Sequence, residues 1–186
     1  MKTYTSIILA ALFLTAWASA ATAQPHSGGQ ASATVEVTAK VVSAINVDVQ
    51  QHLAFGKVKN HTRPQLDPAF QSNRDVGGGA QNGKAVISGA QGGRLKIDLD
   101  RSSYQMVNAD NEAGPVFTPS LAGNSQDDRK EAGKLDANGP NRDVELGSEG
   151  KYYLYMGGDL GPIEQEAYEG GTDTYSTTVT VNVAYN

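Results

Sequence analysis

The most regular hydrophobic pattern of the chain lies in residues 175–186, which read Y-S-T-T-V-T-V-N-V-A-Y-N. Valine and tyrosine occupy odd positions, and small or polar residues occupy the even ones. This period of two over a β-branched run predicts a strand with one buried face. No further strand follows it in the sequence, so we expect its free edge to pair with a segment from elsewhere. The candidate acceptor residues are Val179, Val181, Val183 and Tyr185.

A second alternating stretch lies near the N-terminus. From residue 31 to residue 49, almost every odd position is apolar. This stretch is far longer than the usual strand of about five to six residues. We therefore predict two consecutive strands, 31–39 and 41–50. The first is a candidate donor strand, and the residues on its apolar face are Ala31, Ala33, Val35, Val37 and Ala39.

The middle of the chain alternates between short β-prone runs and glycine-rich turns, and no segment shows an amphipathic helical face. This pattern predicts an all-β sandwich of seven to nine antiparallel strands. The long polar stretch 59–83 is predicted as a loop, the stretch 120–142 as either a surface loop or a hairpin, and Gly157-Gly158 as a turn. The predicted core residues are Ile45, Val47, Phe55, Ile87, Leu95, Ile97, Leu99, Leu154, Val179, Val181 and Val183.

The first residues have the order of an export signal. Lys2 precedes the apolar run 7–17, and Ala21-Thr22-Ala23 fits a cleavage site. We expect a signal peptide (1–23), an N-terminal extension (24–40) and a β-sandwich domain (41–186). The apolar run is too short for a membrane span, so we predict no membrane insertion. This signal predicts a location in the periplasm, at the cell surface or outside the cell.

Composition narrows the range of partners. The formal net charge is -5, and Lys2 is the only charged residue in 1–23, so the mature chain carries -6. An acidic surface disfavours nucleic acid and anionic membranes as partners. The sequence has no cysteine, which excludes disulfides.

Candidate chemistry is sparse. His26, His52 and His61 lack the spacing of a zinc site. Glu164 and Glu166 share a face without the aromatic platforms of a glycosidase cleft, and no nucleophile motif is present. We therefore predict a protein that is not an enzyme and has no cofactor and no metal site. Calcium binding stays open for three acidic loop clusters, which are Asp110 with Glu112, Asp127 with Asp128, and Asp136 with Asn138.

Three segments together carry a resemblance to a known family. They are the alternating start that runs into L-A-F-G (53–56), the stretch G-A-Q-G-G-R-L-K-I-D-L (89–99) and the ending Y-x-x-x-V-T-V-x-V-x-Y (175–185). They resemble the bacterial secreted family called domain of unknown function 4402, which is similar to spore-coat-U-like proteins and chaperone–usher pilin subunits. The resemblance implies an immunoglobulin-like sandwich that lacks its last strand and receives it from a neighbour. The chain departs from many such subunits in having no cysteine pair.

Two hypotheses follow. In the first, the protein is a secreted, pilin-like structural subunit of a fimbrium or adhesive surface layer, and it assembles by donating residues 31–39. Its partners would be further copies or other secreted subunits, with a periplasmic chaperone before assembly. In the second, it is a self-contained periplasmic or surface module. Residues 31–39 would then complete their own sheet, the loops 59–83 and 120–142 would bind a glycan or calcium, and the protein would not polymerise.

Overall fold

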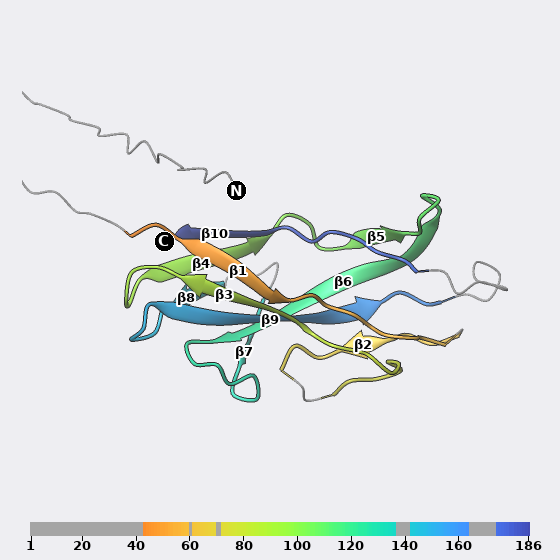
Figure 1. Ribbon diagram of the computed structural model, residues 1–186, viewed down its shortest axis with the longest axis horizontal. Helices are drawn as coiled ribbons and strands as arrows, with labels where there is room; N and C mark the ends of the chain where they lie inside the picture. Colours follow the sequence, from red (N-terminus) through yellow and green to blue (C-terminus); the bar gives the residue numbers. More distant parts are fainter. Residues whose placement is uncertain (1–42, 60, 70–71, 137–141, 164–173) are drawn as a thin grey trace, which may run out of the picture. The chain divides into compact units, whose positions relative to one another are not determined.

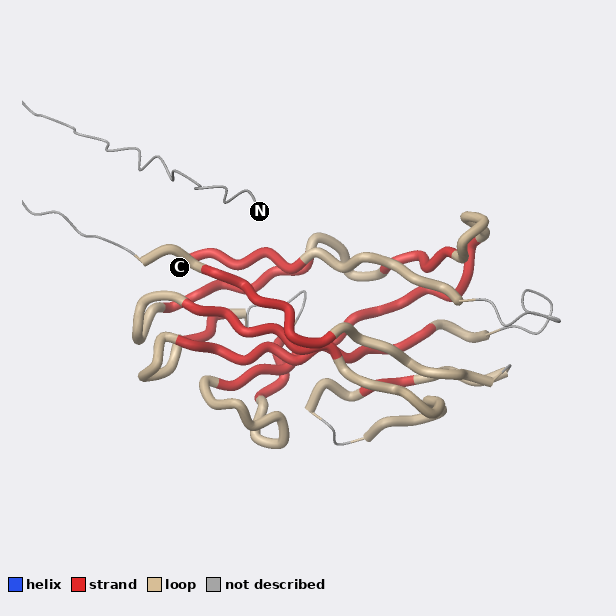
Figure 2. The backbone as a smooth tube through the Cα atoms, in the orientation of Figure 1, coloured by secondary structure: helices blue, strands red, loops and turns tan. Residues whose placement is uncertain are grey.

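The computed structural model describes residues 43–59, 61–69, 72–136, 142–163 and 174–186. Contacts divide the chain into the units Met1–Ala39 and Lys40–Asn186, and all described residues belong to the second. They form strands and loops without a helix, which confirms the predicted all-β class (Figure 2). Consequently, no described helix is long and apolar enough to cross a membrane.

The described residues form ten strands (Figure 1). They are β1 (Asn46–Gln51), β2 (Gln65–Leu66), β3 (Gly83–Ser88), β4 (Arg94–Leu99), β5 (Tyr104–Val107), β6 (Ala113–Asn124), β7 (Gly133–Leu135), β8 (Asp143–Glu145), β9 (Lys151–Leu160) and β10 (Val181–Tyr185). The count exceeds the predicted seven to nine because β2, β7 and β8 have only two or three residues each, too few to show a period in the sequence. β2 lies inside the stretch 59–83, which was predicted as a loop. β7 pairs antiparallel with the end of β6, which confirms the hairpin alternative for 120–142.

The strands form two antiparallel sheets that pack as a sandwich. The larger sheet runs β1-β3-β9-β6-β5, with β2 beside β9 and β7 beside β6, and the smaller runs β10-β4-β8. In the immunoglobulin fold, strands A-B-E-D face strands C-F-G. Here β1-β3-β9-β6 occupy the A-B-E-D positions, β4 the C position and β10 the F position. No described strand occupies the G position beside β10.

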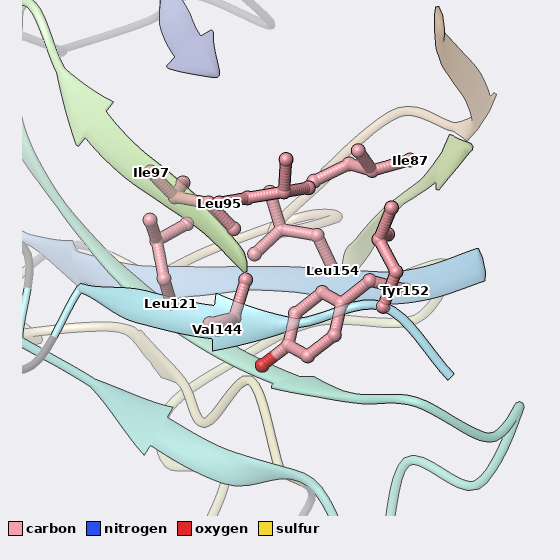
Figure 3. Close-up of a cluster of buried hydrophobic side chains, with 8 residues drawn as sticks. Ile87, Leu95, Ile97, Leu121, Val144, Tyr152 and Leu154 are labelled. Carbon is pink, nitrogen blue, oxygen red and sulfur yellow. The ribbon is translucent and has the colours of Figure 1, made fainter. Parts of the chain in front are cut away.

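The main core lies between the two sheets (Figure 3). Ile87, Leu121 and Leu154 from the larger sheet meet Leu95 and Ile97 from β4, and all five are almost fully buried. Only one face of β4 is buried, so buried and outward side chains alternate along this strand. The outward ones are Arg94, Lys96 and Asp98. Ile45, Leu99, Val181 and Val183 of the predicted core pack against this cluster but are only partly buried.

The outer face of the larger sheet is covered by the two long polar stretches. Asp67 and Asn82 are 4% and 3% exposed, and the amide of Asn82 donates to the Asp67 carbonyl oxygen over 2.8 Å. Arg129, from the second stretch, donates to the Pro68 carbonyl oxygen over 3.0 Å and also binds Asn82. These buried hydrogen bonds connect the two stretches, and Ala69 and Ala132 from them pack against Tyr155 and Ala122 of the sheet.

The predicted turn at Gly157-Gly158 is wrong, because both glycines lie inside β9. A Cβ atom at Gly157 would collide with the Leu66 carbonyl oxygen of β2, and one at Gly158 with the Thr118 carbonyl oxygen of β6. These glycines therefore permit close approach of neighbouring backbones. Sequence alone does not distinguish this role from that of a turn.

Candidate functional site

An open groove of about 540 Å³ lies between β1 and the C-terminal segment, on the inner side of the larger sheet. Val47 and Val49 of β1 line one side, and Val179 and Val181 line the other. The floor includes Ala85 of β3. The groove thus separates the two sheets at the one long side of the sandwich where β1 and β10 both have a free edge among the described strands.

The β1 wall exposes apolar side chains to solvent. Val47 is 41% exposed and Val49 is 59% exposed, so the prediction of Val47 as a core residue is wrong. Its position in the alternating pattern was correct, since it points into the groove. However, the groove is open at this point, so Val47 stays exposed to solvent. Exposed apolar side chains gathered along one groove are typical of a surface that binds a partner.

The free edge of β10 presents a regular row of backbone groups. β10 pairs with β4 in unbroken register from Val181 to Tyr185. Asn186 donates its backbone N–H to Arg94 over 3.0 Å, and the Thr180 carbonyl oxygen accepts from Asp100 over 3.3 Å. In an antiparallel pair, every second residue bonds to a given neighbour. The backbone groups of the even-numbered residues therefore face β4, and the N–H and C=O groups of the odd-numbered ones face the open edge of the sheet.

β1 offers a poorer edge for pairing. Its register with β3 shifts between Val49 and Gln51, so a β-bulge interrupts the ladder. Bulges twist a strand and are one of the ways in which proteins protect an edge. The two walls therefore differ, because β1 contributes apolar side chains, whereas β10 contributes side chains together with an uninterrupted backbone edge.

The floor is lowest in its middle. Gly83 and Ala85 are the smallest inward-facing residues of β3, and both line the groove. Beyond them, Phe55 and Phe117 pack edge to face with their ring centroids 5.8 Å apart. In the other direction Ile87 is fully buried in the main core. The groove is thus a depression bounded by aromatic rings at one end and the filled core at the other.

The C-terminal segment crosses from one sheet to the other along the groove. Ser176 exchanges two backbone hydrogen bonds with Val107 of β5, over 2.9 and 3.0 Å, before β10 joins β4. At the crossing, the Thr180 N–H donates to the Asp100 carboxylate over 3.3 Å. The hydroxyl of Tyr104 donates to the same carboxylate, and this bond, followed by that from Thr180, lowers the pKa of Asp100. The segment is thereby held at both ends of its crossing.

The structure separates the four predicted acceptor residues into two groups. Val179 and Val181 line the groove, whereas Val183 does not, and both Val181 and Val183 pack against the main core. The hydroxyl of Tyr185 accepts a hydrogen bond of 2.8 Å from the Ala90 N–H in the β3–β4 turn. The five predicted donor residues (Ala31, Ala33, Val35, Val37 and Ala39) lie outside the described residues.

Sequence reasoning missed half of the groove. Ala85, Leu154 and Met156 line it together with Phe117 and Met106. Each looks like an ordinary strand residue in the sequence, and only the pairing of β3, β9 and β6 gathers them. On the larger-sheet side of the groove, the sequence pattern indicated only that Val47 and Val49 lie on the same apolar face.

The other candidate chemistry does not converge. Within the described part of the chain, no three His, Cys, Asp or Glu side chains lie close enough to hold a metal ion. Asp127 instead pairs with Lys84 over 2.7 Å and accepts from Tyr155 over 2.9 Å, and these bonds lower its pKa. Asn138, Glu164, Glu166 and His26 lie outside the described residues.

Comparison with known proteins adds no relative, since no family model matches the chain and no curated protein matches it.

Proposed function

We propose that this protein is an exported, non-enzymatic, pilin-like structural subunit that assembles by β-strand addition. The groove beside β10 accepts an extended segment of a neighbouring copy, and residues 31–39 are that segment. The observation that carries the proposal is the uninterrupted free edge of β10 above an exposed apolar groove. Main-chain hydrogen bonds supply affinity in this mode of binding, and pockets for alternate side chains supply specificity.

The shape of the groove favours a strand over a compact small molecule. From Tyr175 to Val181 its C-terminal wall covers six residue steps, which is at most about 20 Å of extended chain. A compact ligand would leave the odd-numbered backbone groups of β10 without partners. An added strand satisfies those groups and covers Val47 and Val49 at the same time.

Residues 31–39 fit this groove by their pattern. Val35 and Val37 supply two adjacent apolar side chains on one face, and Thr34, Glu36 and Thr38 supply a polar opposite face. The segment contains neither proline nor glycine, so each of its residues can donate to a ladder. Before assembly the same groove would need protection, which is the role we assign to a periplasmic chaperone.

The same segment could also reach the groove of its own chain. Residues 40–45 connect it to β1, and a hairpin of that length would place it antiparallel to β1. β1 and β10 run in opposite directions (Figure 1), so such a strand would run parallel to β10. This arrangement corresponds to the self-contained module and is the alternative that an experiment must separate from donation between copies.

Cysteine cross-linking separates the two, because the natural chain has no cysteine. Asn182 is exposed on β10, and its backbone bonds to β4, so Asn182→Cys stands at a non-hydrogen-bonded position of the free edge. One chain carrying Asn182→Cys is mixed with a second carrying Thr34→Cys, Glu36→Cys or Thr38→Cys. Donation between copies predicts a disulfide-linked dimer of the two different chains.

The matched control replaces Asn182→Cys with Glu145→Cys, which is exposed on β8 at the other edge of the same sheet. We expect no mixed dimer from that pair. If the mixed chains stay monomeric, while a single chain carrying both cysteines forms an internal disulfide, then donation between copies is wrong and the self-contained module is correct.

A further inference from the structure

Tyr185 is packed differently from the other apolar residues of the C-terminal strand. Its hydroxyl is held by the Ala90 N–H over 2.8 Å. A Cβ atom at Gly89 would lie 2.5 Å from that hydroxyl, and one at Gly93 would lie 2.9 Å from the Tyr185 ring. The ring therefore fills the space inside the β3–β4 turn, which connects the two sheets.

This packing ends the groove. Val181 is the last residue of β10 that lines the groove, and neither Val183 nor Tyr185 is part of its lining. Both pack against the main core, as Val181 also does, together with Ile45, which precedes β1. On the β1 side the lining likewise begins at Val47. The lining of the groove thus ends at Val181 on β10 and at Val47 on β1.

We propose that Tyr185 sets the register of the incoming strand by closing this end of the groove. This inference rests on the proposed strand addition. Beside Val181 the groove accepts a valine-sized side chain of the added strand, whereas beside Val183 and Tyr185 it accepts only a small one. Tyr185 is accordingly a positioning residue that acts through packing.

The sequence of residues 31–39 matches this requirement in either direction. If the segment runs antiparallel to β10, Val35 lies beside Val181 and Ala33 lies beside Val183. If it runs parallel, Val37 lies beside Val181 and Ala39 lies beside Val183. An alanine therefore meets the closed end in both cases, because alanines flank the two valines on both sides.

Peptide binding tests the inference. The acceptor is the full chain carrying Val35→Asp and Val37→Asp, which cannot fill the groove with its own segment because each buried charge would lack a partner. The probe is a fluorescent peptide of residues 31–40, compared with peptides carrying Ala33→Leu or Ala39→Leu. We expect one leucine peptide to bind about tenfold more weakly or worse, and the other to bind as the unsubstituted peptide does.

The weakened peptide then identifies Tyr185 as the cause. With Tyr185→Leu in the acceptor, which shortens the side chain and keeps it apolar, we expect that peptide to recover most of its affinity. With Tyr185→Phe, which keeps the ring, we expect no recovery. Recovery with neither variant overturns the role of Tyr185, and equal binding of all three peptides overturns the closed end while leaving strand addition intact.

Cross-linking supplies a second measurement that leaves Tyr185 unchanged. In mixtures with Asn182→Cys, the proposed register predicts the fastest disulfide from Thr34→Cys if the strands are antiparallel, or from Thr38→Cys if they are parallel. Glu36→Cys reacting fastest would place a valine beside Val183 and overturn the inference. Failure of every peptide and every cysteine pair would instead overturn the proposed function itself.

Discussion

The two edges of the smaller sheet are built from different residues, although both belong to strands that pack on the same core. β8 has three residues, and its outward side chains Asp143 and Glu145 are charged and exposed. β10 has five residues, and its outward side chains Asn182 and Ala184 are uncharged. Short length and charge are devices that keep a sheet edge from pairing with another chain. The smaller sheet carries them on one edge only.

This difference shows where to look for a partner in an all-β protein. Both edge strands bury apolar side chains, with Val144 on β8 and Val183 on β10 in the same cluster. Hydrophobicity therefore does not separate them. The length of the edge, its regular register and the charge of its outward side chains do, and all three favour β10 as the edge that accepts a strand.

The largest effect is expected from a core substitution in β4, which pairs with both edge strands, β8 and β10. Ile97 of β4 is 2% exposed in the main core, and Ile97→Ala leaves a cavity between the sheets. We expect the free energy of unfolding to fall by about 2–5 kcal/mol, as measured by urea denaturation. Val181→Ala, at the partly buried groove wall, should cost less. A larger loss for Val181→Ala would mean that the groove is already filled in the isolated protein.

Methylation of a peptide nitrogen tests whether the bound peptide forms hydrogen bonds with the β10 edge or only makes apolar contacts in the groove. Methylating one peptide nitrogen of the 31–40 peptide removes one hydrogen-bond donor, and we expect about a tenfold loss of affinity where that donor faces β10. For an antiparallel strand the sensitive position is Val35, and for a parallel strand it is Thr38. Equal tolerance at both positions, measured by fluorescence anisotropy, would show that the peptide binds without joining the sheet.

Charged substitutions on the outward face of β10 should hinder strand pairing at its edge, as the charged side chains of β8 do at the other edge. Asn182→Lys and Ala184→Glu face Asp98 and Lys96 across the pair with β4, so the added charges meet opposite ones. We expect the free energy of unfolding to change by less than about 0.5 kcal/mol, since both sites are exposed. Assembly, followed by size-exclusion chromatography, should weaken several-fold. Unchanged assembly would show that partners do not approach this edge.

The smallest expected effect is a loss of stability at low pH. The pKa of Asp100 is lowered by its hydrogen bond from Tyr104, and that of Asp127 by its bond to Lys84. Each carboxylate therefore stabilises the fold above its unfolded pKa of about 3.9, and this contribution is lost as the pH falls through the lower folded value. We expect the melting temperature to drop below about pH 4, and Asp100→Asn and Asp127→Asn each to reduce that slope. Only the Asp100 variant should also loosen the segment leading into β10, as seen by hydrogen exchange at Thr180.

Local patterns were sufficient to predict the strands that bury one face. β4 lies where the alternation of Arg94 to Leu99 places it. The C-terminal strand has the predicted inward parity, but it begins at Val181 because the preceding residues cross between sheets at Ser176 and Thr180. A period of two records which side chains are buried, and it contains no information about the sheet to which a strand belongs.

The groove depends on tertiary structure in a way that no local pattern expresses. Val47 and Ala85 line it because β1 pairs with β3, and Val181 faces them because β10 pairs with β4. The sequence by itself determined an all-β chain, the inward parity of its strands and the apolar character of residues 175–185. Only the tertiary structure decided that β10 has a free edge among the described strands, that Val47 stays exposed and that Tyr185 is held by the β3–β4 turn. These features arise from contacts between segments far apart in the sequence, whose pairing is set by the packing of the whole sandwich.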